Sequence, residues 1–161
     1  MADKAICGIT TSILPDDIKA SLQGRYSLNP ANNSYKWVYT TADITNTSGV
    51  ILSNSHKFVG STTALADTDK ILWMVIKHTG TSNGVASTSL GIMLSIDGGT
   101  VTWDMPDGIF IDKKEIFTGK FPNTTINNLT AITCGVASGI PALAGTGNVR
   151  VQIAAIINDV A

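Results

Sequence analysis

The alternation of apolar and polar positions divides the chain into short extended segments. Residues 70–77 contain the longest apolar run, which is rich in β-branched and aromatic residues and is bounded by Asp69 and Gly80. This pattern favours a buried strand over a helix. Residues 90–96 form a second apolar run, and the Asp-Gly-Gly sequence at 97–99 can supply the positive φ angles of a tight turn. We therefore expect the chain to fold back sharply at 97–99, within a hairpin core over residues 70–103 that has the two runs as its central pair and around which the chain is organised.

Several other segments have the composition or the period-two alternation of strands. They are residues 35–41, 109–111, 113–119, 129–134 and 148–158. The last segment becomes fully apolar, which predicts a terminal strand that is buried on both faces. Turn residues separate the segments and no strand–helix–strand alternation is present, which is typical of an antiparallel sandwich or barrel. We predict a single all-β domain over residues 1–161, with a jelly-roll-like antiparallel β-sandwich over residues 35–160.

One short helix is predicted near the N-terminus, over residues 13–24. Pro15 suits the first helical position, and the two aspartates that follow it suit the positive end of the helix dipole. Gly24 can cap the C-terminal end of the helix. Ile18 and Leu22 are four residues apart in sequence and would share one helical face.

The composition excludes several classes of protein. Only 14% of the residues are charged, and the chain carries many threonine, serine and asparagine residues instead. Glu115 is the single glutamate, and Arg25 and Arg150 are the two arginines, so a mostly helical protein with charged helix surfaces is not expected. The formal net charge of −1 provides no cationic field for phosphate groups. We expect no nucleic-acid partner.

The N-terminal sequence indicates where the protein is made. No long apolar segment follows Met1, which argues against a secretory signal and against a transmembrane helix. We expect synthesis in a cytoplasm and no membrane partner.

Candidate catalytic and metal-binding residues are few. His56 and His78 have no histidine at metal-ligand spacing, so a metal site would need carboxylates to supply the remaining ligands. Cys7 and Cys134 lie far apart in sequence and form no metal-ligand pattern. We interpret them as buried free thiols, with a disulfide as the alternative. No Gly-x-Ser-x-Gly sequence is present to indicate a serine hydrolase.

Four aspartates that follow the second apolar run are the remaining candidates for catalytic or metal-binding residues. They are Asp97, Asp104, Asp107 and Asp112. A pair of carboxylates could act in glycoside hydrolysis, and an acidic loop could hold calcium. However, Asp97 and Asp107 precede glycine, where an aspartate side chain supports a turn. We interpret the cluster as turn residues, and we expect no enzymatic activity, no cofactor and no metal.

Three segments of the chain resemble a known family. The sequence at 69–80 ends in Lys-His-Thr-Gly, the sequence at 94–100 contains Asp-Gly-Gly, and the chain closes with an apolar segment at 149–160. This pattern resembles small structural proteins of tailed bacteriophages, in which a strand ending in Lys-Asn-Thr-Gly leads to one ending in Leu-Asp-Gly-Gly. His78 stands where asparagine is usual in that family. The resemblance covers about the C-terminal half of the domain.

The resemblance implies a function. It implies a jelly-roll decoration or cement protein that assembles as a homotrimer on the outer surface of an icosahedral virion and binds the major capsid protein. We expect residues 1–12, as an N-terminal arm, and the short helix to reach this partner, because both lie outside the strand-rich region. The apolar residues expected to bind the partner are Ile6, Ile9, Ile13, Leu14, Ile18 and Leu22.

An aromatic stripe supports an alternative function. Tyr35, Trp37 and Tyr39 alternate along one expected strand and would share one face of it. Packing in the core or between subunits is one interpretation of this stripe. The other is a stacking surface for sugar rings, which would make the protein a carbohydrate-binding, lectin-like component of a phage tail or capsid vertex.

Overall fold

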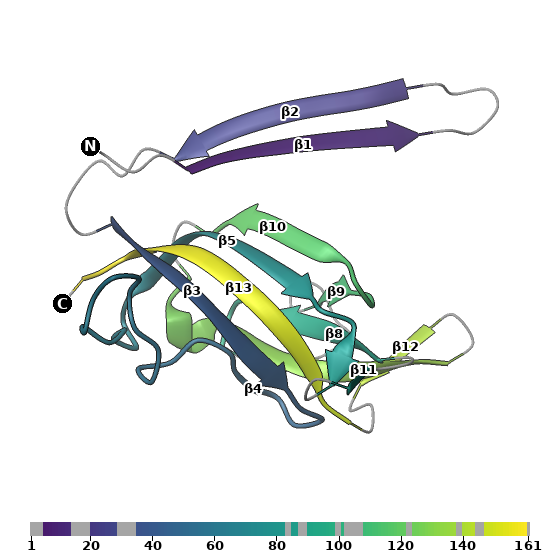
Figure 1. The fold of residues 1–161 in the computed structure, drawn as a ribbon. Helices are drawn as coiled ribbons and strands as arrows, with labels where there is room; N and C mark the ends of the chain where they lie inside the picture. Colours follow the sequence, from purple (N-terminus) through teal and green to yellow (C-terminus); the bar gives the residue numbers. More distant parts are fainter. Residues whose placement is uncertain are drawn as a thin grey trace. The chain divides into compact units, whose positions relative to one another are not determined.

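The computed structural model describes most of the chain, in two compact units. The described residues are 5–13, 20–28, 35–82, 85–86, 90–98, 101, 108–121, 124–137, 140–143 and 147–160. The units are Met1–Tyr35 and Lys36–Ala161. The elements of each unit are drawn in Figure 1. Apart from one 3-10 turn, the described elements are all β-strands.

The first unit contains an antiparallel pair of long strands. Strand β1 (Ala5–Ile13) pairs with β2 (Ala20–Leu28) over the whole length of both strands. The register places Ala5 opposite Leu28 at one end and Ile13 opposite Ala20 at the other. The chain therefore forms a two-stranded ribbon where the sequence predicts an arm and a helix.

The predicted helix over residues 13–24 is wrong for every residue of it that the structure describes. Ile13 is the last residue of β1, and residues 20–24 begin β2, whereas residues 14–19 lie outside the described residues. The physical reason is competition between local and cross-strand hydrogen bonds. A helix this short is marginal on its own, and the β-branched residues of β1 favour extended backbone. The proline and aspartates that suggested a helix start are equally typical of turns.

The second unit contains two antiparallel sheets. The first sheet has four strands in the order β10 (Ile116–Lys120), β5 (Lys70–His78), β13 (Val149–Asn158) and β3 (Tyr35–Ile44). The second sheet has the order β12 (Ile140–Leu143), β11 (Thr130–Ala137), β8 (Leu90–Ser95) and β9 (Ile109–Ile111), and β4 (Gly49–Val50) pairs with β11. The pair β6 (Thr81–Ser82) and β7 (Val85–Ala86) and the 3-10 turn η1 (Ile126–Asn128) complete the unit.

Two ion pairs define the direction of β3 relative to β13. Asp43 pairs with Arg150 near one end of the two neighbouring strands, and Lys36 pairs with Asp159 near the other. A residue late in β3 therefore meets a residue early in β13, which is possible only if the strands run antiparallel. All described neighbours of the first sheet share this arrangement.

The hairpin predicted from the two longest apolar runs is wrong. Strands β5 and β8 belong to different sheets, and β8 pairs with β9 and β11 instead. The Asp-Gly-Gly turn signal is correct in its local effect, because Gly98 has a φ angle of 86° and its N–H donates to the carbonyl of Asn128 at 3.0 Å. An apolar strand needs one side that faces the core. Two such strands can meet this need by packing face to face in opposite sheets of a sandwich, as well as by pairing within one sheet.

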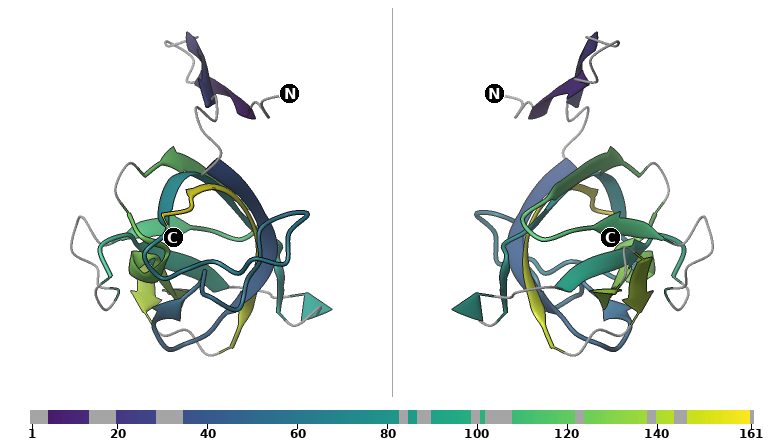
Figure 2. Two further views of the ribbon diagram at one scale, coloured as in Figure 1. Left: turned by 90° about the vertical axis from the view of Figure 1, so that its left-hand side faces the viewer. Right: turned by 90° about the vertical axis from the view of Figure 1, so that its right-hand side faces the viewer.

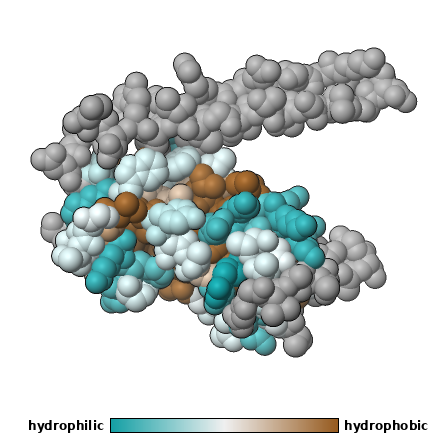
Figure 3. All heavy atoms as spheres, in the orientation of Figure 1, coloured by the Kyte–Doolittle hydropathy of each residue, from teal (hydrophilic) through white to brown (hydrophobic). Residues whose placement is uncertain are grey.

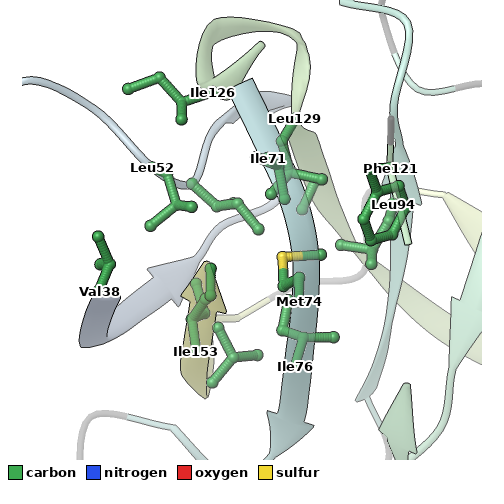
Figure 4. Packing of buried hydrophobic residues seen from close by; sticks show 14 of the residues in the cluster. Val38, Leu52, Ile71, Met74, Ile76, Leu94, Phe121, Ile126, Leu129 and Ile153 are labelled. Atoms are coloured by element: carbon green, nitrogen blue, oxygen red, sulfur yellow. The ribbon is translucent and has the colours of Figure 1, made fainter. Parts of the chain in front are cut away.

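The apolar core lies between the two sheets. Figure 2 shows the strands of the two sheets, and Figure 4 shows buried side chains between them. Among these buried residues are Val38, Ile71, Met74, Ile76, Leu94, Leu129 and Ile153. Strand β13 shows how one strand contributes to this core. Its alternate residues Val149, Val151 and Ile153 are buried, whereas the residues between them are partly exposed. One face of β13 thus enters the core, as expected for strands of period two. The expectation that β13 is buried on both faces holds only near its end, from Ala155 to Ile157.

A buried carboxylate ties the C-terminal segment to the start of β5. The Asp69 side chain is fully buried, and its two oxygens accept hydrogen bonds from the backbone N–H groups of Ala66, at 2.9 Å, and Val160, at 3.1 Å. The Asp69 carbonyl accepts a further bond from the Ile126 N–H at 2.9 Å. One residue therefore joins three segments that are distant in sequence.

We predict that Asp69→Ala lowers the free energy of unfolding by about 2 kcal/mol, because it leaves backbone donors without their buried acceptor. Asp69→Asn keeps one acceptor oxygen and is expected to cost less. The measurement is urea-induced unfolding. Asp67→Ala is the matched control, because Asp67 is exposed and its truncation is expected to change stability by less than about 0.5 kcal/mol. Equal effects of Asp69→Ala and Asp67→Ala would contradict this role.

Candidate functional site

The aromatic residues of β3 lie on the side of the first sheet that points away from the core. Val38 is fully buried, whereas Trp37 is partly exposed and Tyr39 has 62% of its surface exposed. Because side chains alternate along a strand, Tyr35, Trp37 and Tyr39 share this outward side. The structure therefore brings the predicted stacking residues onto one face.

A β-bulge turns Trp73 onto the same face. Ile156 pairs with Trp73 but Ile157 pairs with Ile71, so Leu72 has no partner on β13. The extra residue places Ile71 and Met74 in the core and Trp73 on the opposite side. Trp73 meets Trp37 edge-to-face, with ring centroids 6.1 Å apart and an interplanar angle of 85°.

We call this side of the first sheet the outer face. By alternation and register its members in the second unit are Trp37, Tyr39, Thr41 and Asp43 of β3, Arg150, Gln152, Ala154 and Ile156 of β13, Trp73, Val75 and Lys77 of β5, and Ile116, Thr118 and Lys120 of β10. Figure 3 looks onto β3 and β13, where brown apolar side chains lie among pale and teal ones. Ile156 is only 1% exposed between the two tryptophan strands. The outer face is thus aromatic at one end and polar at the other.

An ion pair occupies the polar end of the outer face. The Arg150 guanidinium donates two hydrogen bonds to Asp43, from Nε to Oδ1 and from Nη2 to Oδ2, both at 2.8 Å. These bonds, together with the positive charge of Arg150, hold the pKa of the Asp43 carboxyl below its usual value. A two-pronged contact of this kind fixes both planar groups in one orientation.

His78 is a structural residue that joins the two sheets. Its side chain is fully buried on β5, and its Nε2–H donates to the carbonyl of Leu90, the first residue of β8, at 2.8 Å. Its Nδ1 accepts a hydrogen bond from the Gly80 N–H at 2.9 Å. Both ring nitrogens are therefore in use, and the accepting role of Nδ1 requires a neutral imidazole.

Burial lowers the pKa of His78, although the Leu90 carbonyl and the charge of Asp112 oppose the shift and Lys113 adds to it. The folded protein consequently takes up this proton at a lower pH than the unfolded chain does. Between the usual histidine pKa of 6.5 and the lower folded value, the unfolded state binds more protons. The stabilising effect of neutral His78 is therefore complete above this window and is lost as the pH falls through it.

We predict that the free energy of unfolding decreases as the pH falls below about 6.5, and that His78→Gln flattens this dependence. The measurement is urea-induced unfolding at a series of pH values. His56→Gln is the matched control, since His56 is partly exposed and its Nδ1 lies 3.1 Å from the Ser53 N–H that donates to it. A wild-type slope in His78→Gln would show that another group causes the acid sensitivity.

The other candidates for chemistry are not brought together. The Asp97 carboxylate accepts a hydrogen bond from Ser95 Oγ at 2.6 Å, and that of Asp112 accepts one from the Lys113 N–H at 2.6 Å. Both bonds are local, as expected for turn residues. Asp104 and Asp107 lie outside the described residues. Within the described ranges, no group of three histidine, cysteine, aspartate or glutamate residues is arranged to hold a metal ion.

Cys134 is a free, buried thiol in the second sheet. Burial raises its pKa to about 11, so it stays protonated near neutral pH. A protonated buried thiol is a poor nucleophile and a poor metal ligand. Cys7 lies on β1, opposite Tyr26.

The predicted partner-binding residues are divided between the strands of the ribbon. Ile6, Ile9 and Ile13 lie on β1, and Leu22 lies on β2 opposite Thr11. Leu14 and Ile18 lie outside the described residues. Ile6, Ile9, Ile13 and Leu22 therefore belong to a two-stranded ribbon, where the sequence predicted an arm followed by a helix.

A shallow hollow of about 240 Å³ lies where β3 ends and β4 begins. Asp43, Thr45 and Thr47 contribute polar lining, and Val50 and Ala131 contribute apolar lining. Ligand pockets are typically larger, at about 300–1,000 Å³, and the Asp43 carboxylate is already bound by Arg150. The hollow therefore offers less chemistry than the outer face.

Sequence reasoning missed part of the outer face. Residues 70–77 were expected to form a fully buried strand, whereas alternate residues on its outward side are partly exposed at Val75 and exposed at Lys77; Trp73, on the same side, is buried at 7% exposed. That alternation, ending in a lysine, was the signal that could have identified it. Nothing in the sequence indicates the pair of Asp43 with Arg150, which are 107 positions apart.

No protein-family model, no curated protein and no solved structure matches the chain. In the part of the chain that the structure describes, no helix has the length and apolar character needed to cross a membrane.

Proposed function

We propose that the protein is a non-enzymatic virion structural protein with a jelly-roll fold, which decorates and stabilises a bacteriophage capsid on its outer surface. In this proposal it binds the major capsid protein and assembles as a homotrimer. The observation that carries the proposal is the strand order of the second unit, because jelly rolls are characteristic of viral capsid and lectin domains.

The strand order supports a jelly roll. This fold is a long antiparallel hairpin wrapped into two sheets, so the first strand pairs with the last, the second with the one before it, and so on inward. Taking β3, β4, β5, β8, β9, β10, β11 and β13 in chain order, the expected pairs are β3 with β13, β4 with β11, β5 with β10, and β8 with β9. All four pairs are present. Wrapping also places β13 beside β5 and β11 beside β8, as observed.

The ribbon of the first unit supports a docking role. A two-stranded hairpin is at best marginally stable in water and needs a further strand or a packing surface for independent stability. Strand β1 has no charged residue and no proline, which are the devices that usually keep a strand edge from pairing. We infer that β1 and β2 bind the capsid protein or a neighbouring copy, and that this binding completes their packing.

The composition of the chain is consistent with a lattice-bound protein. Short threonine, serine and asparagine side chains lose less conformational entropy in a close contact than long charged ones do. With 14% charged residues, few side chains need to be ordered or desolvated at symmetric contacts.

We predict that purified particles of the virus that encodes this chain contain it in a fixed ratio to the major capsid protein, near one or a simple fraction of one. Quantitative mass spectrometry of intact particles measures this ratio. A handful of copies per particle would place the protein at the tail or a vertex, and its absence from particles would exclude the virion role.

We predict that Ile9→Asp and Leu22→Asp, which introduce a charge into each strand of the ribbon, weaken binding to capsids at least roughly tenfold. The thermal unfolding of the second unit should be unchanged, because the ribbon is a separate compact unit. Co-sedimentation with capsids that lack the protein measures binding. Val59→Asp is the matched control, because Val59 is 62% exposed in the second unit. Equal binding by all three variants would exclude the ribbon as the docking element.

A further inference from the structure

We propose that the outer face binds a saccharide, with Tyr39 as the stacking residue and with polar side chains of β13 and β5 as hydrogen-bonding partners. This site is distinct from the proposed docking role of the ribbon, because all of its residues lie on the first sheet of the second unit. The saccharide proposal can therefore be tested independently of the capsid role.

Tyr39 presents the accessible ring of the stripe. It is 62% exposed, and its neighbour Val38 is fully buried, which anchors the strand beneath it. Trp37 has a different role. Its ring packs edge-to-face against the ring of Trp73, with the ring centroids 6.1 Å apart, over the position of Ile156. The Trp37–Trp73 pair forms a rigid apolar block beside Tyr39. A tyrosine ring offers a large contact area at a low cost in side-chain entropy.

Small side chains lie next to Tyr39 across the sheet. Tyr39 is four residues before Asp43, and Ala154 is four residues after Arg150, so Tyr39 and Ala154 fall at about the same level of the antiparallel pair. Val75 lies opposite Ala154 on the next strand. Adjacent strands are about 4.8 Å apart, which is close to the width of a sugar ring. At the level of Tyr39, the outer face therefore presents an aromatic ring beside the short apolar side chains of Ala154 and Val75.

The next level toward Arg150 carries hydrogen-bonding groups. Gln152 lies opposite Lys77, and both have outward positions beside Ala154 and Val75. An amide offers both donors and an acceptor, and an ammonium offers three donors. A sugar ring that stacks on Tyr39 would direct its hydroxyl groups toward this level. An aromatic surface with a few placed polar groups is the usual composition of a specific ligand site.

The charge distribution favours a saccharide over an anionic polymer. The outer face carries three cationic side chains, Arg150, Lys77 and Lys120, and the Arg150 guanidinium is already bound by both oxygens of Asp43. The chain has a net charge of −1, whereas nucleic acids are held mainly by uncompensated cationic charge. A ligand rich in hydroxyl groups needs no such charge.

The test is titration of the full-length protein with soluble tetrasaccharides of glucose, N-acetylglucosamine, mannose and galactose, followed by tryptophan fluorescence and calorimetry. We expect saturable binding of at least one probe, with a change in emission because Trp37 and Trp73 adjoin the site. Tyr39→Ala should weaken this binding roughly tenfold, whereas Tyr39→Phe, which keeps the ring, should stay near wild type. Gln152→Ala should weaken it less.

Val50→Ala is the matched control, because Val50 is also an exposed apolar residue, at 42%, but lies on β4 of the second sheet. Thermal unfolding of each variant verifies that the fold is intact. Absence of binding by all four probes at millimolar concentration would overturn the proposal, and so would binding that Tyr39→Ala leaves unchanged.

Discussion

The pairing of β5 with β13 at the centre of the first sheet is the constraint on which the rest of the second unit depends. These strands place Met74, Ile76 and Ile153 in the core, and each has a further strand on its other side. Since side chains alternate along a strand, a shift of the register by one residue would exchange the buried and outward sets. The bulge at Leu72 makes one such exchange locally, and it keeps both Ile71 and Met74 in the core.

The same register also determines which side chains make up the outer face. Placing Met74 in the core turns Trp73 outward, where Trp37 of β3 reaches it across β13. The buried hydrogen bonds of His78 then connect this sheet to the first residue of β8 in the other. Core packing, the joint between the sheets and the outward position of Trp73 are therefore linked through one strand pairing.

The sequence predicted the strands where the apolar pattern is strongest and failed where the outcome depends on distant partners. The segments at 109–111 and 148–158 agree closely with β9 and β13. The segment at 113–119 began too early, because Lys114 adopts a φ angle of 66° in a turn before β10. The helix over 13–24 and the pairing of β5 with β8 were wrong, because local patterns do not specify which strand is the partner. The stripe of Tyr39 was visible, but its neighbours Trp73 and Gln152 were not, since only the register brings them near.

The two proposed binding surfaces differ in what association requires of the protein. The outer face is ordered before any ligand arrives, since the core fixes β3, β5 and β13, so a ligand there orders few protein groups.

The ribbon is a compact unit of only two strands, and a hairpin of this size gains its stability from what it packs against. Part of the free energy of its association is therefore used to hold the paired strands, which lowers the affinity per unit of contact area. A symmetric assembly offsets this cost, because several ribbons of one oligomer can engage one lattice together and their binding is cumulative. A role that requires firm attachment thus fits the ribbon only in an oligomer, whereas a single outer face is sufficient for reversible recognition of a saccharide.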